Sequence, residues 1–238
     1  MTKHVFLASL VALGYAGALA GQETGKWRVT PSVAMMRFDR TTSLSSTASG
    51  LSTKLWPWAG LDAMYRVRSS LQLGLYVGGS RVTTSPDYFK YALFRSGSNY
   101  ELWAVSQRVT VFNYGIGSEL ALPVGGSLDP YIKGGFGRHT LYPDVQKSNS
   151  VHSFSGAEFA LGGGVRYGLK SGVALRLDIT DFMWSNFDRE LLDPVAPAFQ
   201  NNTFPLSNPD GVLWPKPSLT HNLRLALGFA FTPAGGGQ

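Results

Sequence analysis

Residues 55–80 read Leu-Trp-Pro-Trp-Ala-Gly-Leu-Asp-Ala-Met-Tyr-Arg-Val-Arg-Ser-Ser-Leu-Gln-Leu-Gly-Leu-Tyr-Val-Gly-Gly-Ser. Apolar side chains alternate with polar or small ones on both sides of a short link at 67–70. A period of two residues is typical of a β-strand with one apolar and one polar face. Two such runs joined by a short link indicate a hairpin. The stretch therefore predicts antiparallel strands at about Leu55–Val67 and Leu71–Ser80.

The same alternation recurs along the rest of the chain. It predicts six more strands, at about Trp27–Phe38, Val105–Leu122, Pro130–Thr140, Phe154–Leu169, Val173–Phe182 and Thr220–Phe231. Short and long connectors alternate along the chain. The short ones lie at 67–70, 123–127 and 170–172, and the long polar ones lie at 39–53, 84–101, 144–153 and 185–217. This layout is typical of a barrel threaded through a membrane. We therefore predict an all-β fold: an eight-stranded antiparallel up-and-down transmembrane β-barrel with three short periplasmic turns and four long extracellular loops.

Two of the long connectors have distinctive compositions. The connector at 84–101 is rich in aromatic residues, which favours packing on a rim or contact with a partner. The connector at 185–217 contains six prolines, which cannot donate to a strand ladder, so it is predicted to be a loop with a short turn of helix near Arg189–Leu192.

The N-terminus resembles a secretory signal. Lys3 and His4 precede an apolar stretch that closes on Ala18-Leu19-Ala20. The predicted organisation is a signal peptide at 1–20, the barrel at 21–232 and a short Gly-rich tail at 233–238. No other stretch reaches the roughly 18 consecutive apolar residues that a spanning helix needs, so membrane residence must come from strands.

Composition narrows the function classes. The chain has no cysteine, which excludes disulfides, thiolate metal sites and a cysteine-linked lipid anchor. Only 15% of its residues are charged, against about 25% in an average soluble domain. The net charge of +6 is spread over single basic residues without a Lys/Arg run, so nucleic acid is not an expected partner.

Charged residues fall on the polar faces of the predicted strands. If the apolar faces point to lipid, ten charged side chains enter the interior: Arg28, Asp62, Arg66, Glu119, Lys133, Glu158, Arg166, Arg176, Asp178 and Arg224. The interior of an eight-stranded barrel is just wide enough for side chains to fill, and buried charges must be paired there. The set therefore predicts an ion-pair network that plugs the lumen, with a narrow channel for small solutes as the alternative. Interior glycines are expected to make room for the long charged side chains.

No catalytic, cofactor-binding or metal-binding residue is predicted. The histidines His139, His152 and His221 lack metal-ligand spacing. Some lipid A-modifying hydrolases are eight-stranded barrels with a histidine and a serine on a lipid-facing strand. His221 lies on such a strand, but no serine follows two residues later and Ser218 precedes it. This enzyme remains a second alternative.

Four segments carry a family resemblance. They are Asp129–Gly137 (DPYIKGGFG), Leu161–Gly168 (LGGGVRYG), Leu175–Asp178 with Asp181 beyond it, and His221-Asn222-Leu223 running to Phe229-Ala230-Phe231. In this order over residues 27 to 231 the chain resembles small barrels of the outer-membrane protein A / opacity-protein superfamily. The resemblance implies residence in the bacterial outer membrane, contact with its lipid and lipopolysaccharide, and insertion by the barrel-assembly machinery.

The tryptophans lie near predicted strand ends or in loops, at positions 27, 56, 58, 103, 184 and 214. Such rings favour the membrane interface, so they are expected to form an anchoring girdle. The long loops are where a rigid scaffold carries function. The predicted role is therefore non-enzymatic: structure and surface display, with adhesion to or interaction with an extracellular ligand through the loops.

Overall fold

The computed structural model describes residues 27–44, 54–85, 90–94, 100–104, 106–122, 127–144, 153–170, 172–192, 203–205 and 218–232. The predicted signal peptide and the predicted Gly-rich tail lie outside the described residues. In the part of the chain that is described, no helix is long and apolar enough to cross a membrane.

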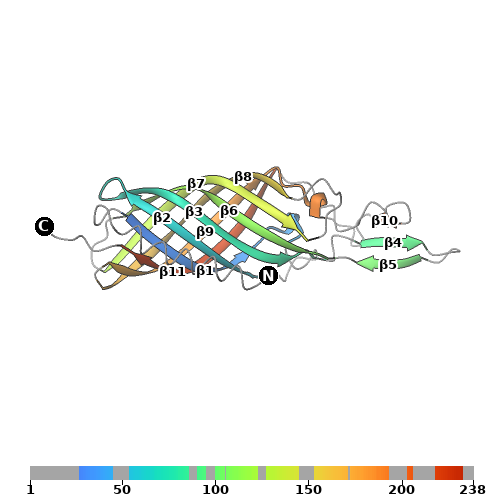
Figure 1. Ribbon diagram of the computed structural model, residues 1–238, viewed down its shortest axis with the longest axis horizontal. Helices are drawn as coiled ribbons and strands as arrows, with labels where there is room; N and C mark the ends of the chain where they lie inside the picture. Colours follow the sequence, from blue (N-terminus) through green and yellow to red (C-terminus); the bar gives the residue numbers. More distant parts are fainter. Residues whose placement is uncertain are drawn as a thin grey trace.

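Within these ranges, eight strands form a closed antiparallel barrel (Figure 1). They are β1 (Trp27–Arg37), β2 (Trp56–Arg66), β3 (Leu71–Thr83), β6 (Arg108–Ala121), β7 (Leu128–Pro143), β8 (Phe154–Lys170), β9 (Val173–Ser185) and β11 (Leu219–Phe231). Each strand pairs with its sequence neighbour in the barrel, and β1 closes the sheet by pairing with β11. The predicted eight-stranded barrel is confirmed.

Most of the strands run past the length needed to cross a bilayer. About 9 to 11 tilted residues suffice, whereas β7 has 16 residues and β8 has 17. The three short links lie at one end of the barrel, called here the turn end. The long connectors leave from the other end, called here the loop end.

Side chains alternate between the inside and the outside of the wall, most regularly in β11. In β11 every second residue is buried, so that Asn222 and Arg224 face inward while Leu223 and Leu225 face outward. This is the period-two pleat of a strand with one face toward the interior and one toward lipid. The alternation that predicted the strands therefore also sets which side chains fill the lumen.

The interior has two layers along the barrel axis. Charged side chains occupy the half nearer to the turn end. The half nearer to the loop end is an apolar and aromatic core that includes Met36, Phe38, Trp56, Trp58, Val82, Val109, Val111, Leu141, Phe182 and Trp184. The position of three tryptophans in this core corrects the girdle prediction: Trp56, Trp58 and Trp184 are buried, while Trp27 is 46% exposed on the outer wall.

Interior glycines make room for tyrosine rings. A Cβ atom at either Gly115 or Gly137 would lie 2.7 Å from the hydroxyl oxygen of Tyr76, and one at Gly164 would lie 2.7 Å from that of Tyr131. The expectation that these glycines serve the charged side chains is therefore incomplete, because they also lie against tyrosine hydroxyls and against backbone carbonyls of neighbouring strands.

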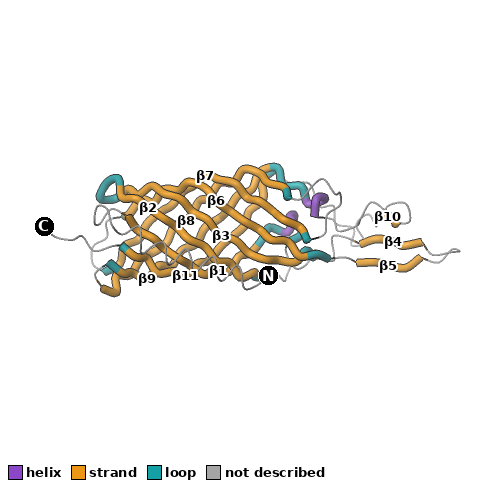
Figure 2. The backbone as a smooth tube through the Cα atoms, viewed as in Figure 1, coloured by secondary structure: helices purple, strands orange, loops and turns teal. Residues whose placement is uncertain are grey.

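The loops contain structure of their own. A second sheet, in the order β10–β4–β5, joins β4 (Lys90–Phe94) and β5 (Tyr100–Ala104) to β10 (Thr203–Pro205), and it lies beyond the loop end of the barrel (Figures 1 and 2). The second long connector is thus a β-hairpin. Short 3-10 helices occur at Arg40–Thr42 and Arg189–Leu192, and the second confirms the predicted helical turn.

Candidate functional site

The charged layer is centred on Arg176. Its guanidinium forms ion pairs with Asp62 Oδ2 at 3.1 Å, with Glu119 Oε1 at 2.9 Å and with Asp178 Oδ2 at 2.9 Å. Its Nε also donates to the Tyr131 hydroxyl at 2.6 Å. The side chain of Arg176 is 1% exposed, so one buried cation joins carboxylates from β2, β6 and β9. The ion pairs of Arg176 thereby connect strands that are far apart in sequence across the lumen.

Glu119 is shared by three arginines. Arg28 and Arg166 both contact its Oε2, and the Arg166 Nη1 distance is 3.0 Å, while Arg176 contacts Oε1. Arg166 also pairs with the half-exposed Asp129 at 2.8 Å. A buried carboxylate with three cationic partners satisfies the condition under which charges survive inside a protein.

Asp178 forms the second anionic centre. It accepts from Lys133 Nζ at 2.8 Å, from Arg224 Nη2 at 3.2 Å and from the Thr180 hydroxyl at 3.1 Å. The side chains of Lys133, Arg224 and Asp178 are all at most 10% exposed. Together with the pairs around Arg176 and Glu119, these contacts form one cross-linked layer.

Glu158 differs from the other interior carboxylates. It is fully buried, and it is held by two neutral donors, the Tyr76 hydroxyl at 3.0 Å and the Trp184 indole nitrogen at 2.8 Å. Among the described residues it forms no ion pair. It lies at the boundary between the charged layer and the aromatic core.

The loop end of the lumen is closed by residues from two loops. Leu44, Phe187 and Leu192 are at most 1% exposed and pack against the aromatic core. The Trp56 indole donates to the carbonyl of Leu44 at 2.9 Å, and the Gln107 amide donates to the carbonyl of Leu192. We call Leu44, Phe187 and Leu192 the apolar cap.

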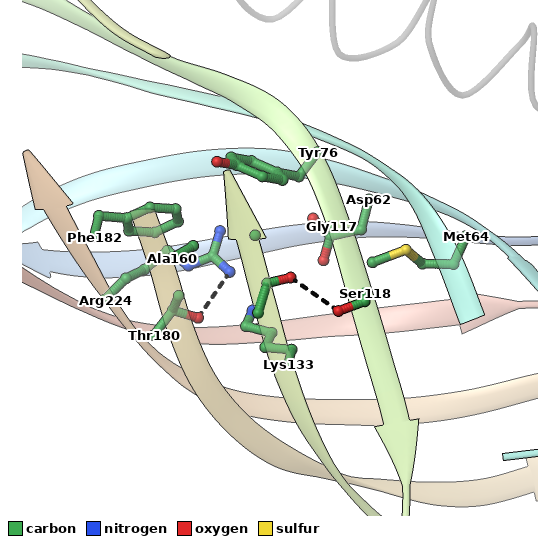
Figure 3. A pocket seen from close by; sticks show the side chains of 12 residues that line it. Asp62, Met64, Tyr76, Gly117, Ser118, Lys133, Ala160, Thr180, Phe182 and Arg224 are labelled. Carbon is green, nitrogen blue, oxygen red and sulfur yellow. Dashed lines mark hydrogen bonds between the residues drawn. The ribbon is translucent and has the colours of Figure 1, made fainter. Parts of the chain in front are cut away.

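A small cavity of about 30 Å³ remains between the two layers (Figure 3). The Lys133, Arg224 and Asp62 side chains line it on the charged side, and Tyr76 and Phe182 line it on the aromatic side. A water needs roughly 10–15 Å³ of such space, so the cavity has room for about two waters. It does not have room for a solute.

All ten predicted interior residues are described, and nine of them lie inside the barrel. Arg66 does not: it is exposed, because it is the last residue of β2 and lies where the turn end opens to water. The prediction that Arg66 belongs to the buried network is therefore wrong. Tyr76 and Tyr131 were not predicted as hydrogen-bonding members of the interior, although they share the inward phase of the polar residues in β3 and β7, which was the available signal.

His221 lies on the outer wall, not in the lumen. Its Nδ1 contacts Asp181 Oδ2 at 2.7 Å, and its backbone N–H donates to Asp39 Oδ2 at 3.1 Å. Within the described residues no serine hydroxyl contacts the imidazole. Among these described residues, the His221–Asp181 pair has no hydrogen-bonded nucleophile of the kind that a serine hydrolase uses.

The outer wall is apolar, with aromatic pairs near both ends. Trp27 and Tyr65 form an edge-to-face pair with ring centroids 5.1 Å apart near the turn end. Phe112 and Tyr142 form another, at 6.0 Å, toward the loop end. Leu75, Ile116, Leu161 and Val33 lie between these ends and are more than 60% exposed, as expected for side chains that face lipid.

Comparison with known proteins agrees with this geometry. The profile of the family described as "Outer membrane protein beta-barrel domain" matches residues 6–206. Neisserial surface protein A is similar in structure, with a TM-score of 0.51 and 12% identity over 87% of this chain and 96% of that one. Two others align with lower scores. The attachment invasion locus protein Ail of Yersinia pestis has a TM-score of 0.41 and 11% identity over 87% of this chain and 99% of that one. OprG of Pseudomonas aeruginosa has a TM-score of 0.41 and 12% identity over 91% of this chain and 99% of that one. No curated protein sequence matches.

Proposed function

Because the chain belongs to the outer membrane protein β-barrel domain family and so resides in the bacterial outer membrane, we propose that it is a non-enzymatic protein that presents its long loops at the cell surface while its lumen stays closed. The closed interior is the observation that carries the proposal. Charge pairs fill the turn-end half of the lumen, and an aromatic core under the apolar cap fills the loop-end half.

The loops are the part of the molecule available for partners. The β10–β4–β5 sheet extends beyond the barrel (Figure 1), and its strands carry aromatic and aliphatic residue types such as Tyr91, Phe94 and Trp103. Loops on a rigid scaffold commonly carry binding function. The proposed partner of this sheet is an extracellular ligand.

The main competing function is a narrow channel, and conductance separates the two. Purified protein in planar bilayers is expected to give no current above that of protein-free bilayers. The variant Phe187→Ala/Leu192→Ala, which removes two side chains of the apolar cap, is expected to stay at background too, since the charged layer closes the lumen independently. Discrete single-channel steps from the wild type would contradict the proposal. Steps from the cap variant alone would favour a channel gated by the cap.

The hydrolase alternative has its own readout. Incubation with lipid A is expected to release no fatty acid. Release by the wild type that disappears in His221→Ala would contradict a non-enzymatic role.

A further inference from the structure

Cationic side chains on the outer wall gather near the loop end. Five strands place a basic residue at an exposed, outward-facing position there: Arg37 on β1, Arg81 on β3, Arg108 on β6, Arg138 on β7 and His221 on β11. We call these five residues the cationic collar. In the described strands, the outward positions between the collar and the turn end carry one charged side chain, Asp181 on β9, which contacts His221.

The height of the collar matches the edge of the hydrocarbon layer. On β1 the cation lies ten residues from the outward residue nearest the turn end, Trp27, and the same spacing recurs between Leu71 and Arg81, Leu128 and Arg138, and Phe231 and His221. Ten residues at about 3.3 Å each, on a strand tilted by about 40°, rise about 25 Å. The apolar band of such barrels is also about 25 Å tall. Four members of the collar therefore lie at the edge of the hydrocarbon layer, and Arg108, which is twelve residues from Leu120 on β6, lies further out at the level of lipid headgroups.

The collar is partly held by neighbouring polar groups. Arg81 pairs with Asp144 at 2.8 Å, with both side chains 42% exposed. Arg138 donates to the Ser155 hydroxyl at 3.3 Å, and His221 contacts Asp181. Among the described residues, Arg37, Arg108 and Arg138 form no ion pair. Within the part of the chain that the structure describes, three guanidinium groups near headgroup level thus lack a protein anion.

We propose that the cationic collar binds the phosphate groups of lipid A, the glycolipid anchor of lipopolysaccharide in the outer leaflet. Long loops of such barrels face the exterior, which places the collar in that leaflet. Arginine is suited to the task, because its planar guanidinium binds phosphate through two parallel hydrogen bonds and its stem can lie along apolar surface. This binding goes beyond the proposed function, since it uses the wall and not the loop sheet.

The test compares two variants that each remove two positive charges. Arg108→Gln/Arg138→Gln alters the collar, and Arg66→Gln/Arg68→Gln removes exposed cations at the turn end. Binding of the purified barrel in neutral detergent is measured for bisphosphorylated lipid A, for dephosphorylated lipid A and for phosphatidylglycerol. A basic residue near an anionic lipid surface contributes roughly fivefold in affinity. The collar variant is therefore expected to bind bisphosphorylated lipid A about 30-fold more weakly, while the turn-end variant binds it like the wild type.

Control ligands and control variants in the same binding experiment show whether the phosphates of lipid A and the collar are responsible for binding. Dephosphorylated lipid A is expected to bind the wild type and the collar variant equally weakly, and Arg108→Lys/Arg138→Lys is expected to keep most of the affinity. If the glutamine variant fails the heat-modifiability test of folding, Arg37→Gln alone is used, with an expected loss of about fivefold.

A variant with residues 86–105 replaced by a short Gly-Ser link is expected to bind lipid A normally, which separates this proposal from the loop function. Equal losses in the collar and turn-end variants, or equal affinity of the wild type for phosphatidylglycerol, would overturn the proposal.

Discussion

Two buried glutamates illustrate how environment decides the role of a residue. Glu119 is surrounded by three arginines, whereas Glu158 is held by a tyrosine and a tryptophan. Both are buried, so burial alone does not distinguish them. The two glutamates differ in their partners. Removing the charge of Glu119 leaves buried arginines without an anion, whereas removing that of Glu158 leaves only neutral hydrogen-bond donors.

We expect Glu119→Gln to lower the free energy of unfolding by about 3–5 kcal/mol, since it leaves buried arginines without their shared anion. Glu158→Gln is the matched control, and it is expected to change stability by less than about 1 kcal/mol because it abandons no cation and keeps a hydrogen-bonding amide. Unfolding of each variant by guanidinium chloride in lipid vesicles measures the two changes in the free energy of unfolding. Equal losses would show that the ion pairs of Glu119 contribute nothing beyond its hydrogen bonds.

Glycine at 137 is required by close packing across the lumen. A Cβ atom there would lie 2.1 Å from the Tyr114 carbonyl oxygen and 2.7 Å from the Tyr76 hydroxyl. We expect Gly137→Ala to destabilise the barrel by about 1–3 kcal/mol through overpacking. Gly134→Ala is the control, because its nearest atom would be 3.8 Å away. Comparable melting temperatures for the two variants in the same detergent would contradict this explanation.

At the level of elements, the barrel strands were predictable because each carries its own period-two signal. The hairpin β4–β5 was not predicted. The third strand of the sheet that contains this hairpin, β10, comes about 100 residues later in the chain. A pairing between segments so far apart leaves no local pattern in the sequence. The aromatic composition of 84–101 indicated packing but not a sheet.

The interior was predictable in composition but not in pairing. Strand phase identified nine of the inward charges, whereas the partners of Arg176 come from β2, β6 and β9 and depend on the register across the whole sheet. The tryptophans were misassigned for a related reason. Trp56 and Trp184 were placed by their nearness to strand ends, although their phase points inward.

At the scale of the whole molecule, the proposal requires one orientation in the membrane. The chain has no cysteine, so single cysteines report their own location. In intact cells, Glu101→Cys in β5 is expected to react with a membrane-impermeant maleimide. Ser69→Cys in the turn between β2 and β3 is the control, and it is expected to react only after the outer membrane is permeabilised. The reverse pattern would place the loop sheet in the periplasm and contradict surface display.

The apolar cap has a consequence for how this sequence can diverge. Its three residues, Leu44, Phe187 and Leu192, come from the same long connectors that are proposed to face the exterior, yet they are buried against the barrel core. These connectors can exchange residues only where the exchange does not open the lumen. Related sequences are therefore expected to vary at their loop tips while retaining apolar side chains at these three positions.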